Sequence, residues 1–181
     1  MPVQIDFAAT AVDGAFVLEP QRMGDDRGFF ALMYAASDFA ALGLSTDIAQ
    51  VNIAHNAHAG TLRGMHFQIA PCQEVKVIRC TRGAVYDVVL DLRPDSGTYL
   101  RWFSTELTAD NRRSTYVPRG CAHGYLTLVD DVEVTYLVST PYSPAHYRGV
   151  RWNDPAFNIE WPMAPAHLHP RDAGYPDFVV R

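Results

Sequence analysis

The chain has 181 residues, of which 48% are hydrophobic and 19% are charged, and its formal net charge is −5. This length suits one well-buried core, so residues 1–181 are predicted to form a single folded domain. The acidic balance argues against a protein that coats nucleic acid, because such proteins usually carry a basic stripe. No basic segment leads into an apolar run near the start and no stretch could cross a bilayer, so a cytoplasmic protein is predicted.

The cysteines indicate the redox compartment of the protein, and the basic residues limit where it could hold an anionic ligand. Cys72, Cys80 and Cys121 cannot all pair within the chain and match no zinc-binding spacing, which indicates reduced thiols in a reducing compartment. Lys76 is the only lysine among the fifteen basic residues, and all the others are arginine. Because the net charge is negative, an anionic ligand must be held by positive charge gathered locally. The position of Lys76 therefore matters.

In chain order, the predicted elements begin with one helix and continue as strands. The segment SDFAALGL, residues 37–44, is predicted to be a helix that Ser37 or Asp38 caps and Gly43 ends. Period-two alternation and turn residues then predict strands within residues 74–93, 99–108, 113–118, 124–129 and 132–140. Many short strands at this spacing indicate an all-β sandwich or jelly-roll barrel. The tail after Trp161 contains four prolines and is predicted to lie over that barrel as irregular chain.

Two of these strands place a polar side chain on an apolar face. Tyr136 shares a face with three valines of its strand, and Lys76 shares a face with Ile78 and Cys80. Taken alone, Tyr136 is more simply explained as a core tyrosine whose hydroxyl bonds to the backbone. A lysine among apolar side chains must be paired, extend its amine to water, or be functional.

The histidines give a mixed signal. The spacing Pro-x-Gly-x-x-His that ends at His123 is the second motif of the cupin barrels, which predicts His123 in a turn before the next strand, pointing into the barrel mouth. Metal-binding cupins supply a His-x-His pair and a glutamate from their first motif, whereas the corresponding stretch here, HFQ, has only His66. Since a divalent transition ion needs three or four protein ligands, no metal site is predicted. For His167 and His169 in the tail, chance or surface placement is the simpler interpretation.

The inward set would then hold two histidines, a tyrosine, a lysine and an arginine, which suits proton transfer. Histidine is the most common general base, and a tyrosine can return a proton from the opposite side. Lysine or histidine donors can stabilise the oxyanion that forms when a proton leaves the carbon next to a ketone. Such a base needs a carboxylate to orient it, and these residues alone do not decide which aspartate serves.

Several motifs, in order, resemble one family. The sequence is similar to the nucleotide-sugar 3,5-epimerases of the dTDP-4-dehydrorhamnose 3,5-epimerase family, members of the cupin superfamily, along nearly its whole length. The segments that carry the likeness are DDRGFF, GTLRGMHFQ, VKVIRCTRGAVYDVVLDLRPDS, LTADNRR, VPRGCAHGY, YSP, RGVRWNDPAFNIEWP and HPRDAGYP. The resemblance implies a jelly-roll homodimer that inverts C3, C5 or both of a 4-keto-6-deoxy nucleotide sugar through an enolate, without a metal or other cofactor.

The resemblance also implies roles for individual residues. His66 would be the base, Asp172 its partner, Tyr136 the acid on the opposite face, and Lys76 the donor near the sugar carbonyl. Arg63, His123 and Arg171 would complete the polar groups around the sugar and phosphates.

The nucleotide end of the substrate would meet the DRGFF segment of the dimer partner. Arg27 would contact the diphosphate and Phe30 the nucleoside, with Gln50 and Asn52 nearby. The chain departs from the family at Leu32 and near Tyr147, where relatives often have glutamates, and near Pro141, where they have an aromatic residue. Losing such carboxylates removes a source of base selectivity, so thymidine diphosphate is the first expectation and the nucleotide stays open.

Three other functions compete with this one. A catalytically silent binding cupin is disfavoured because His66, Tyr136 and Asp172 are all present. A sugar-nucleotide ketoisomerase, which moves protons between C3 and C4 in a related barrel, is disfavoured by the RGMHF context and the pairing of His66 with Asp172. A metal-dependent cupin enzyme lacks the ligands. Which carbons are inverted does not follow from these residues.

Overall fold

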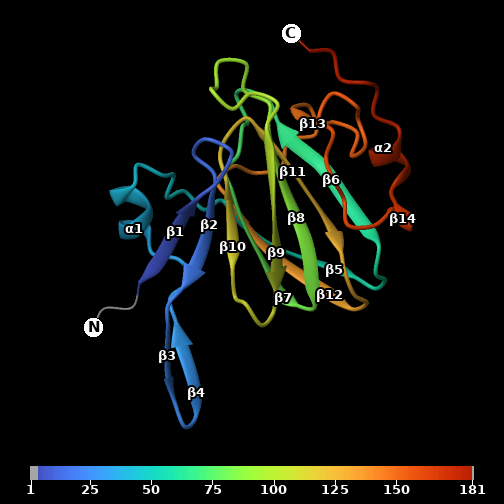
Figure 1. Cartoon of the computed structure of the whole chain (residues 1–181). Helices are drawn as coiled ribbons and strands as arrows, with labels where there is room; N and C mark the ends of the chain where they lie inside the picture. The colour runs from blue at the N-terminus through green and yellow to red at the C-terminus, as the bar shows by residue number, and fades with distance from the viewer. Residues whose placement is uncertain (1–3, 181) are drawn as a thin grey trace.

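The computed structural model describes residues 4–180 and consists mainly of strands arranged in two packed sheets (Figure 1). The first sheet has the order β1 (Ile5–Ala9), β2 (Phe16–Pro20), β10 (Ser114–Val117), β7 (Lys76–Arg82), β12 (Val132–Val138), β5 (Gln50–Asn56). The second has the order β13 (Tyr147–Gly149), β6 (Thr61–Gln68), β11 (Cys121–Thr127), β8 (Ala84–Asp91), β9 (Trp102–Thr108), and β14 (His167–Leu168) pairs with β6. The prediction of an all-β sandwich is confirmed.

The main core lies between the two sheets. Alternation along β12 buries Val132, Val134 and Val138 on one face, as the sequence predicts, while Tyr136 on the same face is only partly buried. Side chains from both sheets meet in this core, among them Ile78, Cys80, Val85, Val89, Leu107 and Val134. Full burial of each such side chain contributes about 1.5–3 kcal/mol, so this layer fixes the spacing of the sheets.

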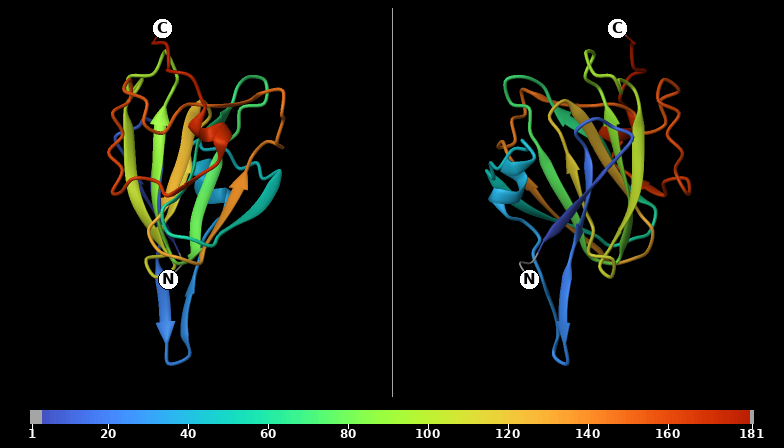
Figure 2. Two further views of the ribbon diagram at one scale, coloured as in Figure 1. Left: turned by 90° about the vertical axis from the view of Figure 1, so that its right-hand side faces the viewer. Right: turned by 60° about the vertical axis from the view of Figure 1, so that its left-hand side comes forward.

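The tail covers the outer face of the second sheet. Phe157 and Trp161 pack with Val88 and Leu90 of β8, and Figure 2 shows the orange-to-red tail crossing that side of the molecule. This cover explains why β8 is buried on both faces and reads as a nearly continuous apolar run. The short helix α2 (Pro170–Ala173) belongs to this tail and lies against β6.

The one predicted helix forms, but it is capped differently. Helix α1 (Ala36–Ala41) begins after Ala35, whose side chain makes no cap, and the Ser37 hydroxyl donates to Asp38 instead. The prediction of a Ser37 or Asp38 cap is therefore wrong, because the helix starts before both residues. Gly43 follows the helix at φ +69°, a conformation that favours glycine, so the predicted end is confirmed.

The structure also corrects the placement of His123. The turn ends at Gly120, whose φ is +81°, and β11 begins at Cys121. His123 is thus the third residue of a strand and pairs with Val89 on one side and His66 on the other. It lies in the sheet because the ladder with β8 starts already at Cys121.

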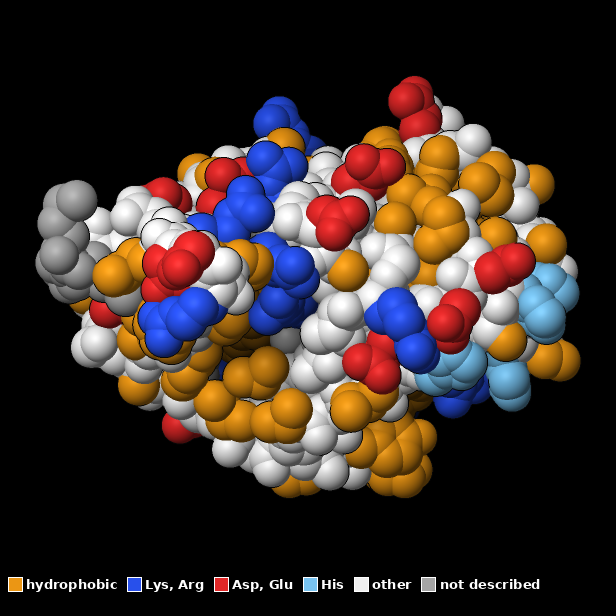
Figure 3. Space-filling model, turned by 90° about the horizontal axis from the view of Figure 1, so that it is seen from below, with side chains coloured by type: hydrophobic (Ala, Val, Ile, Leu, Met, Phe, Trp, Pro, Cys, Tyr) orange, Lys and Arg blue, Asp and Glu red, His pale blue; other side chains and the backbone are white. Residues whose placement is uncertain are grey.

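The hairpin of β3 (Arg22–Asp25) and β4 (Gly28–Ala31) projects away from both sheets (Figure 1). Seen from below, this end of the molecule shows hydrophobic side chains beside arginines (Figure 3). The guanidinium groups of Arg22 and Arg112 lie 5.7 and 5.1 Å from the centre of the Phe29 ring. Phe30 is 64% exposed.

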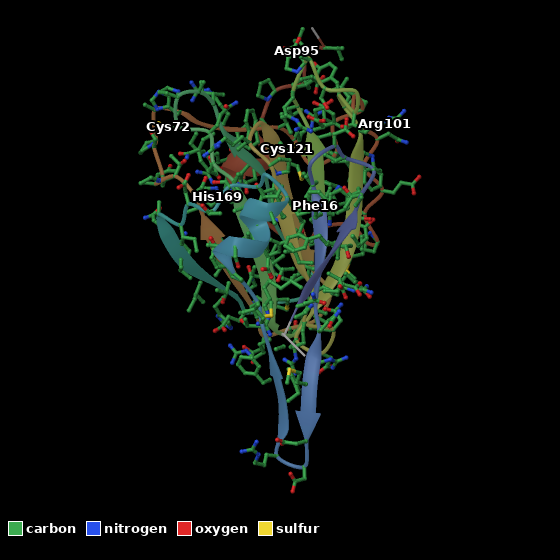
Figure 4. The ribbon with its side chains drawn as sticks, turned by 90° about the vertical axis from the view of Figure 1, so that its left-hand side faces the viewer. Phe16, Cys72, Asp95, Arg101, Cys121 and His169 are labelled. Atoms are coloured by element: carbon green, nitrogen blue, oxygen red, sulfur yellow. The ribbon has the colours of Figure 1, made fainter. Side chains whose placement is uncertain are left out.

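The three cysteines form no disulfide, and Figure 4 shows Cys121 among the strands and Cys72 toward the upper edge. None of the helices within residues 4–180 is long and apolar enough to span a membrane.

Candidate active site

A cavity of roughly 720 Å³ lies between the two sheets and brings most of the predicted site residues together. Strands β5, β7 and β12 form one wall, strands β6 and β11 form the other, and the tail with β14 and α2 closes one side. The predicted residues that line it are His66, Lys76, His123, Tyr136, Asp172, Gln50, Asn52, Arg63 and Arg171. Arg27 and Phe30 do not line it, because they lie on the projecting hairpin.

His66 and Asp172 form a hydrogen-bonded pair at the wall of this cavity. His66 Nε2 lies 2.8 Å from Asp172 Oδ1, although 106 positions separate the residues in the chain. Asp172 Oδ2 accepts a 3.4 Å bond from the backbone N–H of Gly64. The Asp172 side chain is only 3% exposed and that of His66 16%. Since Nε2 is bound to the carboxylate, Nδ1 is the ring nitrogen left to take up a proton.

Two glycines let the strands approach closely enough to build this pair. Gly64 has φ +139°, and a Cβ there would collide with the backbone of Gly124 on the neighbouring strand. A Cβ on Gly124 would in turn lie 2.7 Å from the Met65 sulfur, which is too close. The ladder between β6 and β11 is irregular at this point, between His123 and Tyr125. The glycines therefore set how His66 and His123 face the cavity.

Burial and charge act in opposite directions on the pair. Burial lowers the pKa of His66 below its usual value, and it does so against the hydrogen bond and charge of Asp172, which favour the protonated ring. For Asp172, burial alone would raise the pKa, but the bond to His66, with smaller contributions from Gly64 and Arg171, keeps the pKa below its usual value. The result is a neutral imidazole beside a carboxylate at neutral pH, the state that a general base requires.

A second imidazole and carboxylate lie next to the first. His123 Nε2 is 2.7 Å from Asp87 Oδ1, and both side chains are nearly inaccessible. Asp87 comes from β8, where it sits across the ladder from Tyr125. His123 is thereby fixed on the same wall as His66, its direct partner in the β-ladder.

Lys76 faces these histidines from the other sheet. Its Nζ donates a 3.1 Å hydrogen bond to the backbone oxygen of His66 and lies 3.2 Å from Glu74 Oε1. Burial lowers the pKa of Lys76, and the charges of Glu74 and, less strongly, Asp87 oppose that shift. An ammonium held in this way is a suitable donor to a developing oxyanion.

Tyr136 enters from the same sheet as Lys76, so His66 and Tyr136 approach the cavity from opposite sides. Tyr136 pairs with Ile78 and Asn52 across the ladders of the first sheet, whereas His66 belongs to the second. Within residues 4–180 the Tyr136 side chain makes no protein hydrogen bond. Tyr136 packs against the core between the sheets and also lines the cavity, but the hydrogen bond to the backbone that the simpler interpretation requires is not found within these residues.

Arg63 and Arg171 add positive charge at the rim. Arg63 Nε donates a 2.6 Å bond to Asn56 Oδ1, which orients its guanidinium. The Arg171 guanidinium lies 4.9 Å from the centre of the Tyr147 ring, and its Nε is 3.3 Å from Asp172 Oδ1. The Tyr147 ring is in turn 5.2 Å from that of His66. Arg171 thus connects the rim to the carboxylate of the first pair.

The three positions at which the resemblance predicts a departure from relatives lie in different surroundings. Tyr147 lines the cavity, whereas Leu32 packs in a separate apolar cluster with Phe39. The Pro141 backbone oxygen accepts a 3.3 Å bond from Gln68 Nε2, which holds that loop at the cavity edge.

Sequence reasoning gave no role to Glu74, which lines the cavity, or to Asp87, which holds His123. A usable signal exists for both, because alternation places Glu74 on the face of Lys76 and Asp87 among inward valines. His167 and His169 are exposed, as expected, and both also line the cavity. No group of three or more His, Cys, Asp or Glu side chains in the described part of the chain is arranged to hold a metal ion.

Comparison with known proteins decides the family. A family model described as dTDP-4-dehydrorhamnose 3,5-epimerase matches residues 9–179. The chain belongs to this family. A family member from Sinorhizobium fredii, named dTDP-4-dehydrorhamnose 3,5-epimerase, is 38% identical over 171 residues, which are 94% of this chain and 88% of that protein.

Two further relatives of the dTDP-4-dehydrorhamnose 3,5-epimerase family bear on the fold and the reaction. The crystal structure of the Bacillus anthracis enzyme, solved with TDP and PPi bound, superposes with a TM-score of 0.92 at 41% identity, over 97% of this chain and 100% of that one. The predicted cupin-type jelly roll is thereby confirmed. A Streptomyces niveus protein named dTDP-4-dehydrorhamnose 3-epimerase is 38% identical over 162 residues, 89% of this chain and 78% of the relative.

Proposed function

We propose that the protein is an epimerase that inverts C3, C5 or both in a 4-keto-6-deoxy nucleotide sugar, with thymidine diphosphate as the nucleotide. The observation that carries the proposal is the entry of His66 and Tyr136 into one cavity from opposite sheets. Inversion at carbon needs a base on one face of the ring and an acid on the other. Membership of the family and the TDP bound in the Bacillus anthracis relative support the substrate class.

In the first step, His66 Nδ1 removes the proton from a carbon next to the C4 ketone. The electron pair of the broken C–H bond moves to O4 and forms an enolate, and Asp172 stabilises the imidazolium that results. Lys76 is the donor to O4, and the His123 ring, held through Nε2 by Asp87, assists as a donor in its protonated form. Each positioned proton transfer contributes about a hundred- to ten-thousandfold, so the oxyanion donors must supply a comparable share.

In the second step, Tyr136 gives its hydroxyl proton to the same carbon from the opposite face. The ketone re-forms and the configuration at that carbon is inverted. The phenolate and the imidazolium then exchange protons with solvent, so that no proton or electron is gained overall. Each of these steps uses a side chain of the protein, and none calls for a cofactor.

Deuterium exchange tests this function. Incubation in heavy water with 4-keto-6-deoxy sugars linked to thymidine, uridine, guanosine and cytidine diphosphates should place deuterium at C3, C5 or both, with thymidine fastest. A ketoisomerase would instead yield a 3-keto sugar, and a silent binding protein would bind without exchange. Absence of exchange with every nucleotide would exclude the epimerase.

We infer also that the protein acts as a homodimer whose hairpin completes the site of the partner. Strand β5 lies at the edge of the first sheet, and its Asn52 and Ala54 face the cavity. On its other face, the side chains of Val51 and Ile53 are 61% and 68% exposed. An exposed apolar edge is a ready pairing surface. The hairpin carries further exposed apolar side chains, Met23, Phe29 and Phe30.

Subunit complementation tests the dimer. Arg27→Ala and His66→Ala homodimers should each be impaired, and mixing them after dissociation should restore activity, because one site in each hybrid has both residues. Light scattering should give twice the chain mass of 20.2 kDa. A monomeric mass, or hybrids without activity, would contradict the shared site.

The free cysteines agree with a reducing compartment and support a cytoplasmic location.

A further inference from the structure

Glu74 is a buried carboxylate in the cavity wall that the steps above leave without a role. It lies two residues before the start of β7, its side chain is only 6% exposed, and it lines the same cavity as His66 and Lys76. Oε1 lies 3.2 Å from Lys76 Nζ. Oε2 is buried and has no hydrogen-bond partner among residues 4–180. Burying a charged oxygen without a partner is costly, and such exceptions in folded proteins call for an explanation.

The contacts of Lys76 supply half of that explanation. An ammonium has three N–H donors, of which one bonds to the His66 backbone oxygen and one points to Glu74 Oε1. The third is then directed by these two anchors, and it remains for a ligand in the cavity. Without Glu74, Lys76 would be tethered by a single bond and its amine could rotate away.

The charges around Lys76 explain why a carboxylate is needed there. The second sheet contributes His66, His123 and Arg63 to the same cavity, the tail contributes Arg171, and the sheet of Lys76 contributes Tyr136. The acids Asp87 and Asp172 are each engaged by a histidine. Glu74 is therefore the anion that is free to pair with the ammonium.

The chemistry of the sugar supplies the other half. In a 4-keto-6-deoxy sugar, the carbons beside the ketone are C3 and C5, and only C3 carries a hydroxyl. A ketone oxygen held by Lys76 would place the C3 hydroxyl within reach of the carboxylate beside that lysine. A hydroxyl donor there would satisfy Oε2.

We propose that Glu74 is a further functional residue, which positions Lys76 through Oε1 and accepts a hydrogen bond from the C3 hydroxyl of the substrate through Oε2. This inference rests on the proposed function for its substrate half. Its lysine half depends on the geometry of the protein alone.

The single lysine of the chain makes the lysine half directly measurable. Protein labelled with ¹⁵N only at lysine should give one side-chain amine signal, whose pH titration reports Lys76. In Glu74→Gln, which keeps the shape and removes the charge, the pKa of Lys76 should fall by about one to three units, the usual effect of losing an opposite charge at this range. Glu74→Asp should recover part of the shift. An unchanged titration in Glu74→Gln would overturn this half.

Kinetics test the substrate half. In Glu74→Gln, kcat/KM for deuterium exchange should fall about 10- to 100-fold, with a rise in KM, because the amide oxygen of glutamine is a weaker acceptor for a hydroxyl than a carboxylate oxygen. A 3-deoxy analogue of the substrate lacks the hydroxyl that Oε2 would accept from, so Glu74→Gln should lose less of its kcat/KM relative to wild type on this analogue than on the full substrate, and an equal loss on both would also overturn this half. Equal kcat/KM of wild type and Glu74→Gln on the full substrate would overturn this half. Failure of wild-type exchange would instead reject the proposed function, and the lysine titration would still decide the pairing.

Discussion

Replacement of Asp172 by asparagine tests the central pair of the site. The change keeps the size of the side chain but removes the charge that His66 Nε2 faces at 2.8 Å. A hydrogen bond to a charged group contributes about 1.5–3 kcal/mol, which corresponds to a loss of about 10- to 150-fold in the rate of proton removal. The loss should appear in kcat rather than KM, because the bond strengthens as the imidazolium forms.

The pH dependence of exchange gives the sign of the effect. His66 acts as a base only when neutral, so the rate falls as pH drops through its pKa. Burial lowers the pKa of His66 and Asp172 opposes that shift. In Asp172→Asn the carboxylate no longer raises the pKa of His66, so this pKa falls further. The acid limb of the pH–rate profile should therefore move to lower pH while the maximum rate falls.

A matched control separates this effect from general damage. Asp154 is equally buried and accepts backbone bonds from Ala156 and Phe178, but it does not line the cavity. Asp154→Asn should therefore lose stability with little change in exchange per folded molecule. If Asp172→Asn exchanges at the wild-type rate, or if its acid limb moves to higher pH, Asp172 does not support the base.

Three further changes have distinct expected results. Tyr136→Phe should still permit deuterium exchange but slow inversion at least tenfold, measured by NMR of the product; inversion at the wild-type rate would assign the acid elsewhere. Tyr147→Leu removes the ring under the Arg171 guanidinium, a contact of about 0.5–1 kcal/mol, so KM should rise about two- to fivefold with kcat nearly unchanged in steady-state assays. The pKa of Asp91 is lowered to about 2, because the hydrogen bonds it accepts from Arg93 and neighbouring hydroxyls outweigh burial. Since its pKa is lower in the folded than in the unfolded chain, ionised Asp91 stabilises the fold at neutral pH by about 2 kcal/mol. This contribution is lost as pH falls from about 4 to about 2. In urea titrations, Asp91→Asn should accordingly be destabilised at pH 7 and nearly equal to wild type at pH 2.

The strands that were predicted from the sequence form one continuous stretch of the chain, from β7 to β12. Period-two alternation located β7 to β12 because one face of each packs in the core. It did not locate β1 to β4, β13 or β14, nor β5 and β6, which carry several of the cavity's polar residues. In β6, Arg63, His66 and Gln68 interrupt the apolar pattern, and Gly64 is a poor strand former by propensity. The polar cavity residues therefore obscure the pattern in β6, whereas β7 and β12 keep it despite Lys76 and Tyr136.

The site shows a similar division. The family resemblance pointed to His66, Lys76, Tyr136 and Asp172, which the structure brings to one cavity. Residue types alone could not single out Asp172, because it reaches His66 only through the path of the tail across the second sheet. Partners such as Asp87 were not predicted, since a carboxylate in an apolar strand identifies its partner only when the neighbouring strand is known.

The placement of base and acid in different sheets has a consequence for the reaction. The core between the sheets fixes their spacing, so His66 and Tyr136 cannot exchange positions during turnover. A second inversion in the same molecule of substrate requires the sugar itself to turn, so that the other carbon presents its hydrogen to His66. The ketone must then leave and regain the donors of Lys76 and His123, or pivot about them. Groups that hold the ring through the C3 side, such as Glu74, would oppose that turn once C3 has been inverted, and they would thereby influence whether one carbon or two are inverted.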